Sequence, residues 1–346
     1  MSQKKLLDYC TWDDTYQLTL KKIQVRMLEW VQASPADFEI AMIQGTGNMA
    51  IECILASTVT ERDKLLIICN GHYGKRLSEM AFYLKLDYLI LESGPYEQPD
   101  LTRLAAILDQ EPGITHVAMV HCETKSGILN HLAAISQVVK SREKVFIVDA
   151  VNSFGLAEIQ MEELKIDFLA FSLTPVLHRF SALSFVAAEK VELRRCQNKG
   201  RSYSLHLYNI WRGMAQYRDW HSAPPAYLLY ELEQALADFE ETEAFTRRFQ
   251  GFGQKMELLC QQLGEIGLIN LLKKEHRSPY VASFQWPHPE FDFSELYQRF
   301  KAYDYPIFPS GVMNENSFRL LITERTDWDD IERMTRLAAD YLGSQQ

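Results

Sequence analysis

Residues 116–150 read HVAMVHCETKSGILNHLAAISQVVKSREKVFIVDA, and this stretch decides the fold class. It holds an apolar run, His116–His121, then a polar loop, a segment with helical spacing, Leu132–Val139, and a second apolar run, Val145–Val148. Apolar runs that are solid rather than alternating are typical of strands buried on both faces, as in parallel sheets covered by helices. The stretch therefore predicts a strand–helix–strand unit of an α/β domain.

The same alternation extends from about residue 39 to residue 188 and predicts a mostly parallel sheet of seven strands. A helix over roughly Asp14–Val31 precedes this sheet, and its acidic start suits the dipole of a helix N-terminus. The expected strands are Ile40–Ile43, Leu65–Cys69, Tyr88–Leu91, His116–His121, Val145–Val148, Phe168–Ser172 and Leu183–Ala187. The helices expected between them are Asn48–Leu55, Tyr73–Leu84, Leu101–Leu108 and Leu132–Val139.

After Glu189 the pattern changes to long helices followed by mixed short elements, which predicts a smaller α+β domain. The expected organisation is an N-terminal segment with its helix (1–32), a large α/β domain (33–266) and a small C-terminal domain (267–346). The elements expected in this second half are helices Ala226–Phe239, Thr242–Leu263, Phe293–Tyr303 and Asp327–Leu342, an apolar segment Tyr280–Trp286 and a strand Ser317–Ile322.

The composition predicts a soluble cytoplasmic protein that acts on a small molecule. With 36 basic and 46 acidic residues the formal net charge is −10, which argues against partners such as nucleic acid or an anionic membrane surface. No apolar run reaches the length of a membrane span, and the N-terminus lacks the apolar region of a secretory signal. The six cysteines lie far apart without a CxxC pair, so reduced thiols are expected and no metal site is predicted.

Chemistry is expected in the loops after the strands, because ligands of such sheets collect at the carboxyl ends of the strands. Gln44-Gly45-Thr46-Gly47-Asn48 leads from a strand into a helix, where free N–H groups favour a phosphate, although a plain turn has the same pattern. Asn70-Gly71-His72-Tyr73-Gly74 places an aromatic ring that could stack on a planar ligand or pack the turn.

Two further loops add polar groups. One is the cluster His121–Gly127, and the other begins with Asp149 at the end of an apolar strand. A buried carboxylate requires a cation or donor, unless backbone N–H groups of its own loop satisfy it. Together, a phosphate loop, a stacking aromatic and an acid suit a phosphorylated heteroaromatic ring with a protonated nitrogen.

These loops resemble those of the class V aminotransferases, which use pyridoxal 5′-phosphate (PLP) on the fold type I scaffold, and most closely the branch that acts on 2-aminoethylphosphonate. The matching segments, in the order of the family, are Cys10-Thr11-Trp12-Asp13-Asp14, Gln44-Gly45-Thr46-Gly47, Asn70-Gly71-His72-Tyr73-Gly74, His121-Cys122-Glu123-Thr124, Ser126-Gly127-Ile128-Leu129-Asn130, Val148-Asp149-Ala150, Ser153-Phe154-Gly155 and Ser317-Phe318-Arg319.

The resemblance implies a PLP site, an amino acid, keto acid or phosphonate as substrate, and a homodimer with the site at the interface. Asp149 is expected to keep the pyridine nitrogen protonated, which makes the ring an electron sink. Arg319 is expected to bind a substrate carboxylate, although a surface arginine has the same pattern. The other cofactor contacts implied are Thr46, Gly47 and Asn48 to the phosphate, Tyr73 and Val151 on the two ring faces, Thr124 near the ring oxygen, and Thr174.

The match fails at the Schiff-base lysine. Counted without gaps from Asp149, that position is Pro175, and no lysine lies between Lys165 and Lys190. Proline has no amine to form the covalent link or to move the proton. The family's Thr-Pro-Pro, whose threonine reaches the partner subunit's phosphate, is Ala223-Pro224-Pro225 here. Conventional transamination is therefore not expected, and PLP would be held without a covalent link or not at all.

Three functions stay open from the sequence. The chain is a degenerate homologue that still binds a ligand, an enzyme with lysine-independent chemistry on PLP, pyridoxamine phosphate or another small ligand, or a noncatalytic subunit that assembles with an active paralogue. His178 could serve as the base of the second, although it suits a repacked loop equally well. Lys125 could supply an amine, although a solvated lysine fits the same position.

Overall fold

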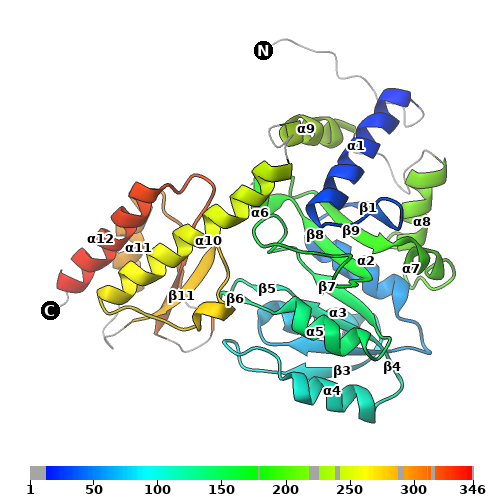
Figure 1. Cartoon of the computed structure of the whole chain (residues 1–346), viewed down its shortest axis with the longest axis horizontal. Helices are drawn as coiled ribbons and strands as arrows, with labels where there is room; N and C mark the ends of the chain where they lie inside the picture. The colour runs from blue at the N-terminus through cyan, green and yellow to red at the C-terminus, as the bar shows by residue number, and fades with distance from the viewer. Residues whose placement is uncertain are drawn as a thin grey trace.

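The computed structural model describes residues 13–177, 180–217, 226–237, 242–286, 292–309, 311–312 and 316–344. These residues form a large α/β unit followed by a smaller unit built on a second sheet, as Figure 1 shows from blue through green and from yellow to red. Within the described part of the chain, no helix is both long enough and apolar enough to cross a bilayer.

The large unit is organised by a seven-stranded sheet in the order β1-β9-β8-β7-β4-β2-β3. Strand β9 is antiparallel to both of its neighbours, and all other pairs are parallel, so six strands end at the same edge. This confirms the mostly parallel seven-stranded sheet. The strands are β1 (Phe38–Gln44), β2 (Lys64–Cys69), β3 (Asp87–Glu92), β4 (Ile114–Val120), β7 (Val145–Asp149), β8 (Phe168–Ser172) and β9 (Leu183–Glu189).

Helices cover this sheet because its strands are apolar on both faces. Helix α2 packs against β8 and β9, whereas α3 packs against β2 and β4. The carboxylate of Asp100 begins α4 by accepting bonds from the N–H groups of Thr102 and Arg103, at 2.8 and 3.1 Å. The described helices of this unit are α1 (Asp14–Trp30), α2 (Gly47–Thr58), α3 (His72–Tyr83), α4 (Leu101–Gln110), α5 (Leu132–Lys140), α6 (Thr174–Leu177), α7 (Lys190–Arg195), α8 (Leu207–Arg212) with a π-helical turn Gly213–Tyr217, and α9 (Ala226–Ala237).

Stacked aromatic rings fill part of the core. The ring of Phe171 on β8 lies between Phe154 and Phe185, with centroid distances of 4.1 and 5.3 Å. Trp30 at the end of α1 contacts Phe154 at 6.0 Å. Helix α1 is thereby fixed to the sheet that follows it in sequence.

The small unit has a four-stranded antiparallel sheet in the order β10-β11-β13-β12. Buried side chains of the long helix α10, among them Met256 and Leu259, share one hydrophobic core with this sheet, although the predicted boundary at 266 groups the helix with the large domain. The boundaries themselves stay predictions. The elements are α10 (Thr242–Glu265), β10 (Ile269–Asn270), a 3-10 turn (Lys274–His276), β11 (Val281–Gln285), α11 (Phe293–Lys301), β12 (Ile307–Pro309), β13 (Ser317–Leu321) and α12 (Trp328–Ser344).

Candidate functional site

The strand order brings the predicted loops together at one edge of the large sheet. Strands β1, β2, β4, β7 and β8 all end there, as the parallel pairs and the reversed β9 require. The N–H of Gly45 donates to the carbonyl of Ala182 at 2.8 Å, which anchors the first loop beside the start of β9.

The loop after β1 leaves the start of α2 open. Thr46 is the N-cap residue in extended backbone conformation, but its side chain makes no capping hydrogen bond, and the side chains of Thr46 and Asn48 are exposed. Gly47 is buried, and a Cβ at this position would overlap both methyl groups of Val151. The N–H of Met49 donates to the carbonyl of Thr46 at 2.8 Å. This leaves the N–H groups of Gly47 and Asn48 without an acceptor among the described residues, an arrangement that favours an anion.

Glu123 occupies the start of the neighbouring helix, α3. Strand β5 (Cys122–Glu123), paired with β6 (Ile128–Leu129), carries this fully buried side chain. Its two carboxylate oxygens accept from the N–H groups of Tyr73 at 2.9 Å and Gly74 at 2.6 Å, and Gly71 leaves room for it because a Cβ there would overlap the carboxylate. Burial raises the pKa of Glu123, while these bonds oppose the increase. Sequence reasoning missed this cap, since a two-residue strand has no periodicity to reveal it.

Tyr73 lies in the first turn of α3 and is half-buried. The hydroxyl of Thr124 donates to the phenol oxygen of Tyr73 at 3.4 Å, and the guanidinium of Arg76 lies 5.1 Å from the centre of the tyrosine ring. The predicted cofactor residues Tyr73 and Thr124 are therefore in contact with each other.

Asp149 ends β7 and is only 8% exposed. Its Oδ1 accepts from the N–H of Val151 at 2.9 Å, so part of the alternative interpretation, satisfaction by its own loop, is correct. Within the described residues Oδ2 has no hydrogen-bond partner. Burial raises the pKa of Asp149 to about 7, with a further increase from the charge of Glu123 and a decrease from Arg76. The group is suited to a cationic partner such as a protonated ring nitrogen.

Two buried polar pairs hold the surrounding loops. Nδ1 of His121 lies 2.9 Å from the hydroxyl of Ser153, and burial lowers the pKa of His121 to about 3, so this ring stays neutral. Nδ2 of Asn70 donates to Oδ1 of Asn130 at 2.7 Å, and Nδ2 of Asn130 donates to the carbonyl of Val120 at 2.8 Å. The histidine pair joins the end of β4 to the loop after β7, and the asparagine pair fixes the ends of β2 and β4 to the loop that follows β6.

Pro175 lies in the first turn of α6, directly after β8, with Thr174 before it; both residues are half-buried. Proline fits this position because the N–H groups of a first helical turn have no acceptor within the helix. The N–H of Leu177 donates to the carbonyl of Leu173 at 2.8 Å and closes the turn. The proposed base His178 lies outside the described residues, as do Ala223-Pro224-Pro225.

Arg319 on β13 is buried, with 7% exposure, so the alternative interpretation as a surface arginine is wrong. Its Nη1 donates to the carbonyl of Thr124 at 2.8 Å and its Nε to that of Pro309 at 3.2 Å, while the guanidinium lies 5.5 Å from the ring of Phe308. Burial lowers the pKa of Arg319. No carboxylate among the described residues pairs with it, which suits a group that binds an external carboxylate or phosphonate.

The small unit holds the loop after β4 at several further points. The hydroxyl of Ser283 donates to the carbonyl of Ser126 at 2.7 Å, and the N–H of Ser278 donates to that of Gly127 at 2.8 Å. The phenol of Tyr280 donates to the carbonyl of Asn152. The loop that carries Glu123 and Thr124 is thus bonded to α3 on one side and to the second sheet on the other.

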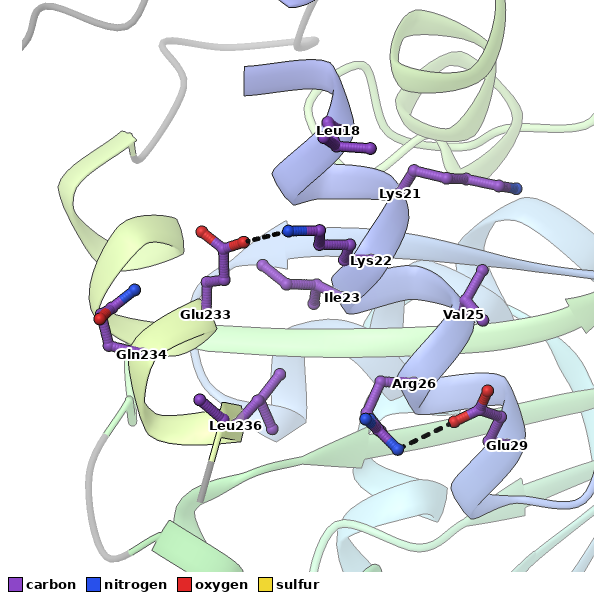
Figure 2. A pocket seen from close by; sticks show the side chains of 11 residues that line it. Leu18, Lys21, Lys22, Ile23, Val25, Arg26, Glu29, Glu233, Gln234 and Leu236 are labelled. Atoms are coloured by element: carbon purple, nitrogen blue, oxygen red, sulfur yellow. Dashed lines mark hydrogen bonds and ion pairs between the residues drawn. The ribbon is translucent and has the colours of Figure 1, made fainter. Parts of the chain in front are cut away.

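A separate cavity of about 660 Å³ lies between α1 and α9 (Figure 2). Lys22 pairs with Glu233 across it at 3.2 Å, and Arg26 pairs with Glu29 on α1 at 3.2 Å. None of the loop residues above lines this cavity, so it is not part of the site at the strand ends.

Comparisons with known proteins agree with this architecture. The profile of the family described as Aminotransferase class-V matches residues 15–177. A 2-aminoethylphosphonate--pyruvate transaminase of Bacillus cereus (strain 03BB102) is 32% identical over 330 residues, which cover 95% of this chain and 90% of that protein.

Solved structures show the same fold at lower identity. Alanine--glyoxylate aminotransferase from Nostoc sp. has a TM-score of 0.84 at 20% identity, covering 96% of this chain and 89% of that one. Ureidoglycine-glyoxylate aminotransferase from Bacillus subtilis has a TM-score of 0.86 at 21% identity, covering 97% and 87%.

Proposed function

The chain belongs to the class V aminotransferase family, on the fold of the PLP-dependent fold type I enzymes, and we propose that it binds a pyridoxal-type phosphate reversibly and does not carry out conventional transamination. Its relatives named as 2-aminoethylphosphonate--pyruvate transaminases support a small amino acid, keto acid or phosphonate as second ligand. We assign this second ligand to Arg319.

The residues present fit a pyridoxal phosphate. The open first turn of α2 suits its phosphate, and Oδ2 of Asp149 suits its ring nitrogen. Val151 lies beside both, because it faces Gly47 and its N–H binds Asp149, and we assign Tyr73 to a face of the ring by its resemblance to the family. When bound, the cofactor supplies an electron sink. In this site Asp149 would hold a proton at the ring nitrogen, because an ionised carboxylate that is 8% exposed requires a positive partner.

The observation that carries the proposal is Pro175 at the first turn of α6, in a chain that keeps Asp149, Tyr73 and the glycine loop after β1. A proline provides neither a primary amine for covalent attachment nor a base to move a proton. The chain therefore retains the means to hold the ring and its phosphate, and lacks the group on which the family's usual reaction depends.

The test is a titration of the purified protein with PLP, followed by borohydride reduction and intact-mass measurement. We expect reversible changes in absorption and fluorescence, weakened by Asp149→Asn, and no covalent mass increase on the wild-type chain. A stoichiometric mass increase would refute the proposal. Lys125→Met is the matched variant, since loss of that mass increase in it would identify Lys125 as the attached amine.

We further propose that the form that binds the ligand is a homodimer. Thr46 and Asn48 are exposed in the single chain, and a second subunit would cover them. Light scattering at micromolar concentration should give twice the chain mass of 40.1 kDa. A monomer that dimerises only when mixed with a lysine-bearing homologue would instead support the partner-subunit function.

A further inference from the structure

We propose that Arg76 is the cation that binds the phosphate group at the start of α2, an assignment that rests on the proposed function. Arg76 lies on α3, one turn after Tyr73, and its guanidinium reaches toward the loop after β1. In that position it would complete the anion site that the first turn of α2 begins.

Three neighbours fix the guanidinium. Nη1 donates to Oδ1 of Asn48 at 3.2 Å, Nη2 lies 3.2 Å from Nε2 of His72, and the group lies 5.1 Å from the centre of the Tyr73 ring. His72 can accept this bond only when Nε2 is unprotonated; burial and the charges of Arg76 and Lys125 lower the pKa of His72 in agreement. The arginine is thus held in place by groups that do not neutralise it.

No carboxylate among the described residues forms an ion pair with Arg76, whose side chain is half-buried. Asp149 and Glu123 are close enough to feel its charge, but neither carboxylate forms a hydrogen bond with it. Two of its five N–H groups are engaged, so three are available to a ligand.

A phosphate is the ligand that matches these donors. The planar fork of an arginine suits phosphate oxygens, and the fork is bonded to the side chain of Asn48, a residue of the first turn of α2. Without a covalent link at residue 175, the affinity for the cofactor depends on non-covalent contacts alone, and the phosphate carries the largest charge of the ligand. A charged contact from Arg76 to the phosphate would let a site without the lysine hold its ligand.

The experiment compares PLP with pyridoxal, which lacks the phosphate, in the wild-type chain and in Arg76→Gln. We expect Arg76→Gln to weaken PLP binding about 10- to 100-fold, the range of a charged hydrogen bond, and to change pyridoxal binding less than about twofold. Arg76→Lys keeps the positive charge and should therefore lose less PLP affinity than Arg76→Gln does. Lys75→Gln removes the same charge from the adjacent, exposed position of α3 and should change neither affinity.

The other outcomes separate the role of Arg76 from the proposed function. Equal losses for PLP and pyridoxal in Arg76→Gln would show that the arginine only supports Tyr73, and would overturn the inference while leaving the proposed function intact. If the wild-type chain binds neither compound, the proposed function fails, and inorganic phosphate becomes the probe in a thermal-shift titration. A phosphate shift lost in Arg76→Gln would then support the inference, and its absence or persistence would overturn it.

Discussion

Replacing Asp149 with asparagine should change how the stability of the ligand-free protein depends on pH. The carboxyl is 8% exposed, and burial raises its pKa from an ordinary 3.8 to about 7. Because the folded state binds this proton more tightly than the unfolded state, the stabilising contribution is complete below about pH 4 and is lost as the pH rises through 7. A difference of about three pH units, at roughly 1.4 kcal/mol per unit, amounts to about 4 kcal/mol.

Asparagine removes this dependence while keeping an oxygen that can accept from the N–H of Val151. Urea unfolding from pH 5 to pH 8 covers the larger part of this loss, so the wild-type protein should lose about 3 kcal/mol relative to Asp149→Asn. Asp109→Asn is the control. Asp109 is an exposed acid whose pKa is lowered by its bond to Arg142, so it stays ionised throughout this pH range. The free energy of unfolding of this variant should therefore change with pH as that of the wild type does. Parallel pH profiles for the wild type and Asp149→Asn would refute the reasoning.

Three further substitutions test the site. Pro175→Lys should give a chain that retains pyridoxyl phosphate after borohydride reduction, seen by intact mass, since the first turn of α6 needs no N–H bond at that residue. Gly47→Ala should lower the free energy of unfolding in urea by about 1–3 kcal/mol and weaken PLP binding, because the added Cβ overlaps Val151. The control is Gly251→Ala, which should leave the protein equally stable or more stable because a Cβ there meets open space. Glu123→Gln should cost about 1–3 kcal/mol, measured by the same unfolding, because an amide accepts only one of the two N–H groups at the start of α3.

The pattern of apolar runs was sufficient to predict the sheet and the edge where the site lies. Solid runs such as Val145–Val148 identify buried parallel strands, and the direction of those strands brings Asp149 and the loop after β1 to the same edge. The segments that carry the family resemblance pointed to the same residues. Pro175 is likewise visible in the sequence, because a missing amine is a property of a residue type and needs no coordinates.

Contacts between distant segments could not be predicted in the same way. The carboxylate of Glu123 caps a helix about 50 positions earlier in the chain, and Arg76 meets Asn48 across two helices. Neither contact leaves a periodic signal, because the first depends on how β5 packs against α3 and the second on how α3 lies beside α2. The burial of Arg319 also follows from tertiary packing, since a strand pattern of five residues does not show which face another unit covers.

The hydrogen bonds on both sides of the loop 122–127 affect how the large and small units separate. Glu123 ties the loop to α3, and the carbonyls of Thr124 and Ser126 accept from Arg319 and Ser283 in the small unit. Separating the two units breaks these carbonyl bonds and removes the support of the residues beside Tyr73. The amides at the start of α3 and those of β11 should therefore exchange with solvent as one cooperative unit, so that a ligand bound between the strand ends slows exchange in a sheet it does not touch.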